Sequence, residues 1–241
     1  MSTENTKVIN KSNLDLYLNE LSKAYKKLAG RKTKVEIILI GGAAIIENYG
    51  FRDMTTDIDA VYAASSAMKE AINEVGDKYG LPNGWLNSDF KKTASYSSEL
   101  NRYSVAYKTF NQILEVRTVT SEYLIAMKLR SGRQYKNDLS DIIGILNEHS
   151  KQNNPITYNQ VDKAVCNLYG GWDGFSAESI AFIKNAFANG DFEKLYDITR
   201  ENEKQAKSLL IGFENDYPDK LNTENVNTVL ERLKKKKNDK K

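Results

Sequence analysis

An apolar segment that ends in two glycines constrains the fold of this chain more than any other feature. Residues 35–40 are apolar and mostly β-branched apart from Glu36, Gly41 and Gly42 follow, and a second, largely apolar run that carries two aspartates covers residues 56–63. Short β-branched runs bounded by glycine predict buried strands. We therefore expect two strands, joined by a short helix over residues 43–49.

The second expected strand carries two acidic residues, Asp57 and Asp59, with Ile58 between them. Because side chains alternate along a strand, both carboxylates face the same way, with Cα atoms about 7 Å apart. Two converging carboxylates repel each other unless a cation lies between them. Mg²⁺ prefers such sparse carboxylate sites, completed by substrate phosphates, so we expect both to bind Mg²⁺ (or Mn²⁺). The alternative is a solvated face of an edge strand, where paired acids need no partner.

The two glycines and a threonine add a possible phosphate site to this pattern. Gly41 and Gly42 permit close backbone approach, and the N-terminus of the following helix offers N–H groups to a phosphate. We expect them to bind a nucleotide together with Thr56. Thr55 and Thr56 stand at the entrance of the strand, where the alternative roles are to hydrogen-bond the acids or to cap the strand. Two adjacent glycines also fit an ordinary strand-to-helix turn.

Taken together, these residues resemble the nucleotidyltransferases of the DNA polymerase beta superfamily, which carry a Gly-Gly or Gly-Ser turn and then Asp-x-Asp on the next strand. The closer match is to the AbiEii-like branch, the abortive-infection and toxin–antitoxin nucleotidyltransferases. Those proteins often read Gly-Gly-x-Ala and then Arg-x-x-Thr-x-Asp-Ile-Asp, as this chain does from Gly41 to Asp59. The resemblance covers roughly residues 35–148.

A second segment is similar to the same branch, which carries a Lys on a helix, then Arg, then Lys-Asp-x-x-Asp opening the next helix. The matching residues are, in chain order, Lys128, Arg133, Asp138 and Asp141. The segment departs from the family pattern because Asn137 separates Lys136 from the first aspartate, and because the spacing after the arginine is longer.

The resemblance implies roles for these matched residues. Lys128 and Arg133 are expected to bind the nucleotide, since a lysine can neutralise a triphosphate. Asp141 is expected to hold Lys128 in place, or to act as a base on the acceptor hydroxyl. The alternative is a charged helix–turn–helix with ordinary ion pairs.

A third carboxylate on a neighbouring strand often completes the metal site in polymerase-beta-like enzymes. Glu115 is similar in kind, since Glu115 and Arg117 share one face of an expected strand over residues 112–119. We therefore include Glu115 among the expected metal ligands. The alternative is an ordinary exposed Glu–Arg face.

The remaining pattern completes the expected architecture. We expect a first helix over residues 13–29, capped by Asn13 and ended by Gly30. Strands are expected over 102–108 and 112–119, and helices over 66–78, 122–131, 138–149, 157–169, 177–188, 192–213 and 223–236. This order predicts an α+β fold: a nucleotidyltransferase-type mixed sheet flanked by helices in a domain 1–150, then a helical bundle over 151–241.

Composition excludes several other classes of protein. No apolar run approaches the roughly 20 residues of a membrane span, and the polar start lacks a secretion signal. Cys166 is the only cysteine, and a single cysteine excludes an internal disulfide and fits a reducing cytoplasm. We expect Cys166 itself to lie in the core. The net charge is +3, and residues 234–241 alone hold six lysines and one aspartate, so the remainder is slightly acidic. That basic tail fits a solvated, frayed helix end or an arm that attracts RNA phosphates.

The sequence thus predicts a cytoplasmic, metal-dependent nucleotidyltransferase that moves an NMP from an NTP to an acceptor hydroxyl. The resemblance further implies an acceptor such as the 3′ end of tRNA, a cognate antitoxin protein, and a role as a toxin or in phage defence. Two alternatives stay open. One is a catalytically inactive nucleotide-binding module of the same fold, and the other is a small-molecule (antibiotic) nucleotidyltransferase.

Overall fold

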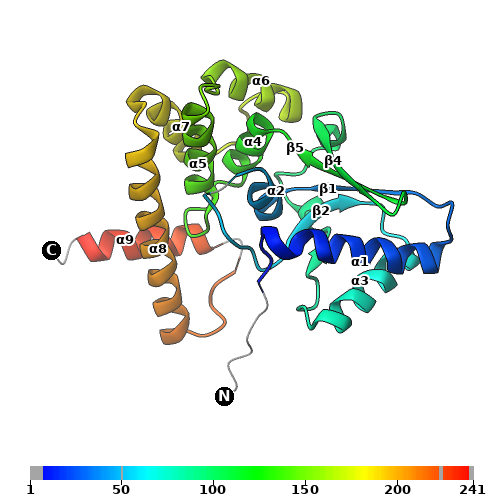
Figure 1. The fold of residues 1–241 in the computed structure, drawn as a ribbon. Coiled ribbons are helices and arrows are strands. Elements are labelled where there is room, and N and C mark those ends of the chain that lie inside the picture. Colours follow the sequence, from blue (N-terminus) through cyan, green and yellow to red (C-terminus); the bar gives the residue numbers. More distant parts are fainter. Residues whose placement is uncertain (1–7, 50, 223–224, 239–241) are drawn as a thin grey trace. The chain divides into compact units, whose positions relative to one another are not determined.

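The computed structural model describes residues 8–49, 51–222 and 225–238, and Figure 1 shows them as a mixed sheet and a series of helices. The chain divides into two compact units. The first extends to Leu124 and includes Ala164–Gly170, and the second consists of Ile125–Lys163 and the chain from Gly171 onward. The predicted boundary at residue 150 falls inside the second unit, and a domain boundary there stays a prediction.

The sheet of the first unit has five strands in the order β3-β2-β1-β5-β4. Their bounds are β1 Val35–Leu39, β2 Ile58–Tyr62, β3 Leu86–Asn87, β4 Ser104–Phe110 and β5 Leu114–Val119. The central strand β1 pairs antiparallel with β2 and parallel with β5, and β4 pairs antiparallel with β5. This mixed sheet confirms the predicted fold class, while the short strand β3 was not predicted.

Helices of the first unit pack on this sheet because each presents an apolar stripe. Helices α1 and α3 lie side by side (Figure 1), and residues such as Leu18 and Leu21 of α1 are fully buried. The bounds are α1 Lys11–Ala29, α2 Gly41–Asn48, α3 Ser66–Tyr79 and α4 Ser121–Ser131, with 3-10 helices at Asp89–Lys92 and Ser98–Asn101. Helix α4 continues from the first unit into the second.

The start of α1 corrects one prediction. Asn10, not Asn13, is the N-cap, and its side chain accepts the backbone N–H groups of Ser12 and Asn13. Asn13 occupies the third helical position, where its side chain accepts the N–H of Asn10 and completes a capping box. The local sequence contains two asparagines three residues apart, and only the reciprocal hydrogen bonding distinguishes their roles.

The second unit is helical, as predicted. Its helices are α5 Asp138–Lys151, α6 Tyr158–Tyr169, α7 Ala177–Asn189, α8 Phe192–Asp216 and α9 Val226–Asn238, of which α6 also reaches into the first unit. Helix α5 packs along α8, and α9 crosses α8 around a small apolar cluster that includes Ala206, Leu210 and Leu230. The predicted start of α9 at 223–224 and the end of the lysine tail at 239–241 lie outside the described residues.

Cys166 is exposed on α6, so the prediction that it belongs to the core was wrong. The buried stripe of α6 consists of Val161, Ala164, Val165 and Leu168, and position 166 is rotated about 100° away from position 165. Within the parts of the chain that the structure describes, no helix is long and apolar enough to cross a bilayer.

Candidate functional site

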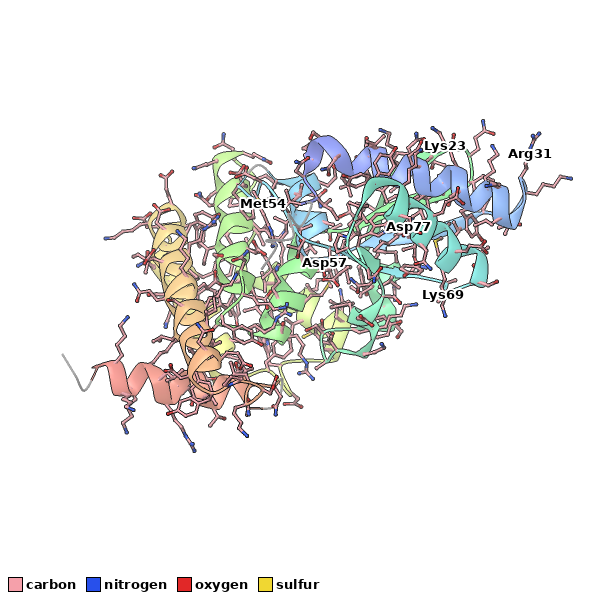
Figure 2. All side chains as sticks on the ribbon, turned by 90° about the horizontal axis from the view of Figure 1, so that it is seen from below. Lys23, Arg31, Met54, Asp57, Lys69 and Asp77 are labelled. Carbon is pink, nitrogen blue, oxygen red and sulfur yellow. The ribbon has the colours of Figure 1, made fainter. Side chains whose placement is uncertain are left out.

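The predicted aspartate pair lies at the start of β2. The strand begins at Ile58 rather than at residue 56, so Asp59 is inside it and Asp57 lies on a bend just before it. Figure 2 labels Asp57. Ile58 and Ala60 are fully buried, whereas Asp57 and Asp59 are half-buried. The apolar residues therefore anchor one face of the strand, while both aspartates keep partial exposure.

Gly41 places the first turn of α2 against the Asp59 carboxylate. The Ile40 N–H donates to the Asp59 carbonyl at 3.0 Å, which continues the pairing of β1 with β2. Gly41 has a φ of +58°, and a Cβ added there would lie 3.3 Å from Asp59 Oδ2. Glycine is therefore required twice, for its left-handed backbone and for the close approach of the carboxylate.

The N-terminus of α2 has the features of an anion site. Its N-cap, Ile40, cannot accept the helix N–H groups with a side chain, and the first turn holds no acidic residue. Such a terminus carries a partial positive charge and unpaired N–H groups. A phosphate can meet both of these needs.

Arg52 and Thr55 pack against the second glycine, and the sequence reasoning did not identify this role for either. A Cβ added at Gly42 would lie 2.8 Å from Thr55 Oγ1 and 2.9 Å from Arg52 Nη2. Arg52 also donates from Nε to the Met54 carbonyl at 3.2 Å. A guanidinium thus lies at the turn where the sequence predicts phosphate binding. The available signal was its place in the Arg-x-x-Thr stretch before the aspartates.

Thr56 contacts the aspartate pair as one reading of the sequence predicts. Its hydroxyl donates to Asp57 Oδ1 at 3.4 Å, at the long end of hydrogen-bond distances. A role of Thr56 in nucleotide binding stays a prediction.

The strand register separates Glu115 from the aspartate pair. Glu115 lies opposite Glu36 on β1, whereas Asp59 bonds to Ile40, four residues after Glu36 and just beyond the end of β1. Four residues of strand span on the order of 13 Å. Glu115 instead forms an ion pair with Lys34 at 3.4 Å. The register therefore does not bring Glu115 to the pair, and no group of three His, Cys, Asp or Glu side chains suited to a metal occurs among the described residues.

The second predicted group of residues forms a buried ion-pair network, which we call the Lys128 cluster: Lys128, Arg133, Asp138 and Asp141. Lys128 Nζ lies 3.2 Å from Asp138 Oδ1 and 2.7 Å from Asp141 Oδ2. Arg133 binds Asp138 with two nitrogens, Nε at 2.7 Å and Nη2 at 3.2 Å. The predicted contact of Asp141 with Lys128 is present, and Lys128 is only 8% exposed.

The charges in the Lys128 cluster are mutually compensated. Burial alone would raise the pKa of Asp138, but Lys128 and Arg133 outweigh burial and hold that pKa well below its usual range. Two carboxylates thus stabilise one buried ammonium group. The nucleotide-binding roles of Lys128 and Arg133 stay predictions, and the geometry also fits the alternative of a structural ion-pair network.

Glu203 of α8 joins the first turn of α5, and the sequence reasoning missed it. Its Oε1 accepts the backbone N–H groups of Leu139 at 2.9 Å and Ser140 at 3.2 Å. The N-cap of α5, Asn137, makes no side-chain cap hydrogen bond, so Glu203 supplies the cap from another helix. Burial, reinforced by nearby Asp141, raises the pKa of Glu203 to about 7. Nothing in the local sequence around residue 203 distinguishes it from its charged neighbours.

Comparison with known proteins gives one match. Residues 17–168 match the model of a family described as "Nucleotidyltransferase of unknown function (DUF6036)". This range covers more than half of the chain and includes both the aspartate pair and the Lys128 cluster. No curated protein and no solved structure matches the chain.

Proposed function

This chain belongs to that nucleotidyltransferase family, and we propose that it is a metal-dependent enzyme that transfers an NMP from a nucleoside triphosphate to an acceptor hydroxyl. The family description implies the triphosphate substrate. The observation that carries the proposal is the Asp59 carboxylate, whose Oδ2 would lie 3.3 Å from a Cβ at Gly41, at the start of α2. A group that attracts cations therefore adjoins a backbone terminus that attracts anions. A metal-bound polyphosphate meets both requirements.

The residues at β2 fit a divalent cation. Asp57 and Asp59 supply oxygen ligands and are half-buried, and they flank Ile58, which is fixed in the core. Oxygen ligands of this kind suit Mg²⁺ or Mn²⁺, which often keep several waters and take the rest of their ligands from phosphates. When bound, such an ion would neutralise the charge that develops on the phosphate oxygens.

The chain's own residues would orient the triphosphate. The N–H groups at the start of α2 and the Arg52 guanidinium at Gly42 present positive charge on one turn. We propose that they bind non-bridging phosphate oxygens and keep the α-phosphorus in line with the attacking hydroxyl. The gain would come from positioning and electrostatics, because phosphoryl transfer requires little covalent chemistry from the protein.

For the Lys128 cluster we propose a positioning role. Lys128 forms ion pairs with Asp138 and Asp141, and Arg133 forms one with Asp138. The Lys128 pairs connect α4 to the first turn of α5. Asp141 is 3% exposed, which favours its holding Lys128 over its acting as a base on an acceptor. The cluster would then affect transfer through the stability of the second unit.

We further propose, from the resemblance, that the chain belongs to the AbiEii-like branch and acts as a toxin of a toxin–antitoxin or phage-defence system. The 3′ end of tRNA would be the acceptor, and a cognate antitoxin protein would restrain the enzyme. The six lysines of residues 234–241 are compatible with an RNA acceptor, because lysines bind RNA phosphates. Binding of RNA through such contacts would weaken as the salt concentration rises.

Incubation of the purified protein with Mg²⁺ and each α-³²P-labelled NTP tests the proposal. Separate reactions contain total RNA, a protein extract, aminoglycosides and lincosamides, or no acceptor. We expect label in the tRNA fraction, lost by about a thousandfold or more in the double variant Asp57→Ala, Asp59→Ala while the fold is retained. Transfer that survives in the double variant contradicts the mechanism, and label only in the antibiotic reactions indicates a small-molecule enzyme.

A second function, Mg²⁺-dependent nucleotide binding without turnover, is favoured by one observation. Within the described residues no third carboxylate joins Asp57 and Asp59. Glu115 pairs with Glu36, four residues before the Ile40 that bonds to Asp59. Binding of an NTP that requires Mg²⁺ and both aspartates, without label transfer to any acceptor, would support this function.

A further inference from the structure

The second unit contains a cavity of about 440 Å³ that plays no part in the function proposed above. It is lined mainly by α8 and α9, with Leu139 of α5 and Phe182 of α7. Its volume is within the range of small-molecule sites. Phe182 and Leu209 supply apolar wall, while Glu203, Lys234 and Lys237 supply charge.

Glu203 brings an unused hydrogen-bond acceptor to this cavity. The residue is 4% exposed, and its Oε1 already accepts two N–H groups of α5. Its Oε2 is buried and has no hydrogen-bond partner among the described residues. An unsatisfied buried carboxylate oxygen is costly, and most buried polar groups are paired. A ligand with an N–H donor would remove this cost where Glu203 is ionised, and the titrations described below are therefore carried out at pH 8, above the Glu203 pKa of about 7.

Two lysines, Lys234 and Lys237, add positive charge to the wall of the cavity. Lys234 Nζ donates to Gln134 Oε1 at 2.7 Å, which fixes the ammonium group at the cavity wall. Lys237, one turn further along α9, also lines the cavity and is exposed. Both ammonium groups would repel a purely cationic ligand and attract a phosphate. The cavity thus suits a ligand with an N–H donor, an apolar or flat middle, and an anionic group.

We propose that this cavity binds a nucleoside monophosphate, with a base N–H group at Glu203 Oε2, the base against Phe182 and Leu209, and the phosphate at Lys234 and Lys237. This second nucleotide site uses neither the aspartate pair nor the glycine turn and needs no divalent cation. Because the other oxygen of Glu203 caps α5, an occupant would also hold the cap of the helix that carries Asp138 and Asp141.

Isothermal titration calorimetry of the full chain with AMP, GMP, CMP and UMP, in EDTA, tests this inference. The double variant Asp57→Asn, Asp59→Asn is titrated in parallel, so that a nucleotide bound at the aspartate pair is recognised. We expect at least one monophosphate to bind both proteins equally. We expect Glu203→Gln, which keeps an acceptor for α5 but opposes the ligand's donor, to weaken binding about tenfold or more. Lys237→Ala should weaken it about threefold or more.

Matched controls decide the outcome. Lys236→Ala removes a neighbouring exposed lysine that does not line the cavity and should change the affinity less than about twofold. Leu209→Trp, which fills the cavity, should abolish binding without removing any charge. Absence of binding by all four monophosphates, unchanged affinity in both Glu203→Gln and Lys237→Ala, or equal affinity for inorganic phosphate alone would overturn the proposal. Since Lys237 is exposed, its variant remains informative even if a core variant fails to fold.

Discussion

Two pairs of aspartates, one in each unit, show opposite solutions to the same electrostatic problem. Asp138 and Asp141 are almost fully buried and are compensated by Lys128 and Arg133 of the same unit. Asp57 and Asp59 stay half-buried beside the start of α2. The first pair is neutralised by buried cationic groups, whereas the second keeps the partial exposure that our proposal of a bound cation and substrate requires. Close spacing of acids in a sequence therefore does not by itself distinguish a structural pair from a functional one.

The largest expected effect contrasts Asp138 with Asp57. Asp138→Ala removes the buried carboxylate that both Lys128 and Arg133 bind and leaves Asp141 to compensate Lys128, and we expect it to lower the free energy of unfolding by roughly 3–5 kcal/mol. Asp57→Ala should change that free energy by only about 0.5 kcal/mol or less, because the side chain is half-exposed. Urea unfolding of both variants measures the difference. Equal losses would remove the contrast between the two pairs.

The next effect concerns Glu203, whose folded pKa of about 7 lies above its ordinary value of 4.5. The folded state then favours the protonated form, so this group's contribution to stability is fully present below pH 4.5 and is lost as the pH rises to 7. As the pH rises from 4.5 to 7.5, the free energy of unfolding of Glu203→Gln should increase by on the order of 3 kcal/mol relative to that of the wild type. Denaturant unfolding at several pH values measures this difference. A pH-independent difference would show that burial of Glu203 has no such cost.

A smaller effect is expected at the glycine turn. Gly41→Ala forces alanine into a φ of +58°, which we expect to cost about 1–2 kcal/mol, and it also presses on Asp59. Gly84→Ala is the matched control, because Gly84 has a φ of +75° but nothing within 4 Å of an added Cβ. Thermal unfolding should shift similarly in both variants, whereas NMP transfer should fall only in Gly41→Ala. Unchanged NMP transfer in Gly41→Ala would show that the glycine turn does not belong to the active site.

The smallest effect tests an exposed ion pair against the Lys128 cluster. Lys151 and Glu193 lie 2.9 Å apart, with side chains 52% and 73% exposed. Lys151→Met should cost less than about 1 kcal/mol in urea unfolding, because solvent screens the pair and holding it costs side-chain entropy. A loss as large as that of Asp138→Ala would mean that burial does not set the strength of these pairs.

Much of the architecture could be predicted from the sequence because it depends on local patterns. The strand–glycine–helix–strand order from residue 35 to residue 62 and the helices of the second unit follow from apolar periodicity and glycine placement. The short strand β3 was missed because two residues carry no periodic signal. Asn10 replaced Asn13 as the cap of α1 because two nearby asparagines compete for the same role.

The candidate site could be predicted only in part. The sequence was enough to predict that Ile58 is buried and that Asp57 and Asp59 on either side of it keep partial exposure. The role of Glu115 was not predictable in this way, because the pairing of β5 with β1 sets its distance from Asp59. The positions of Arg52 and Glu203 likewise depend on segments that approach from elsewhere in the fold.

The sequence by itself determined which residues could carry charge and which faces must be buried, because both follow from residue type and the periods of helix and strand. Only the tertiary structure decided which charges meet. It paired Lys128 with two buried aspartates, set Asp59 against the turn at Gly41, and brought Glu203 to the start of α5. These contacts join residues that different elements contribute, so they depend on packing and strand register rather than on local pattern.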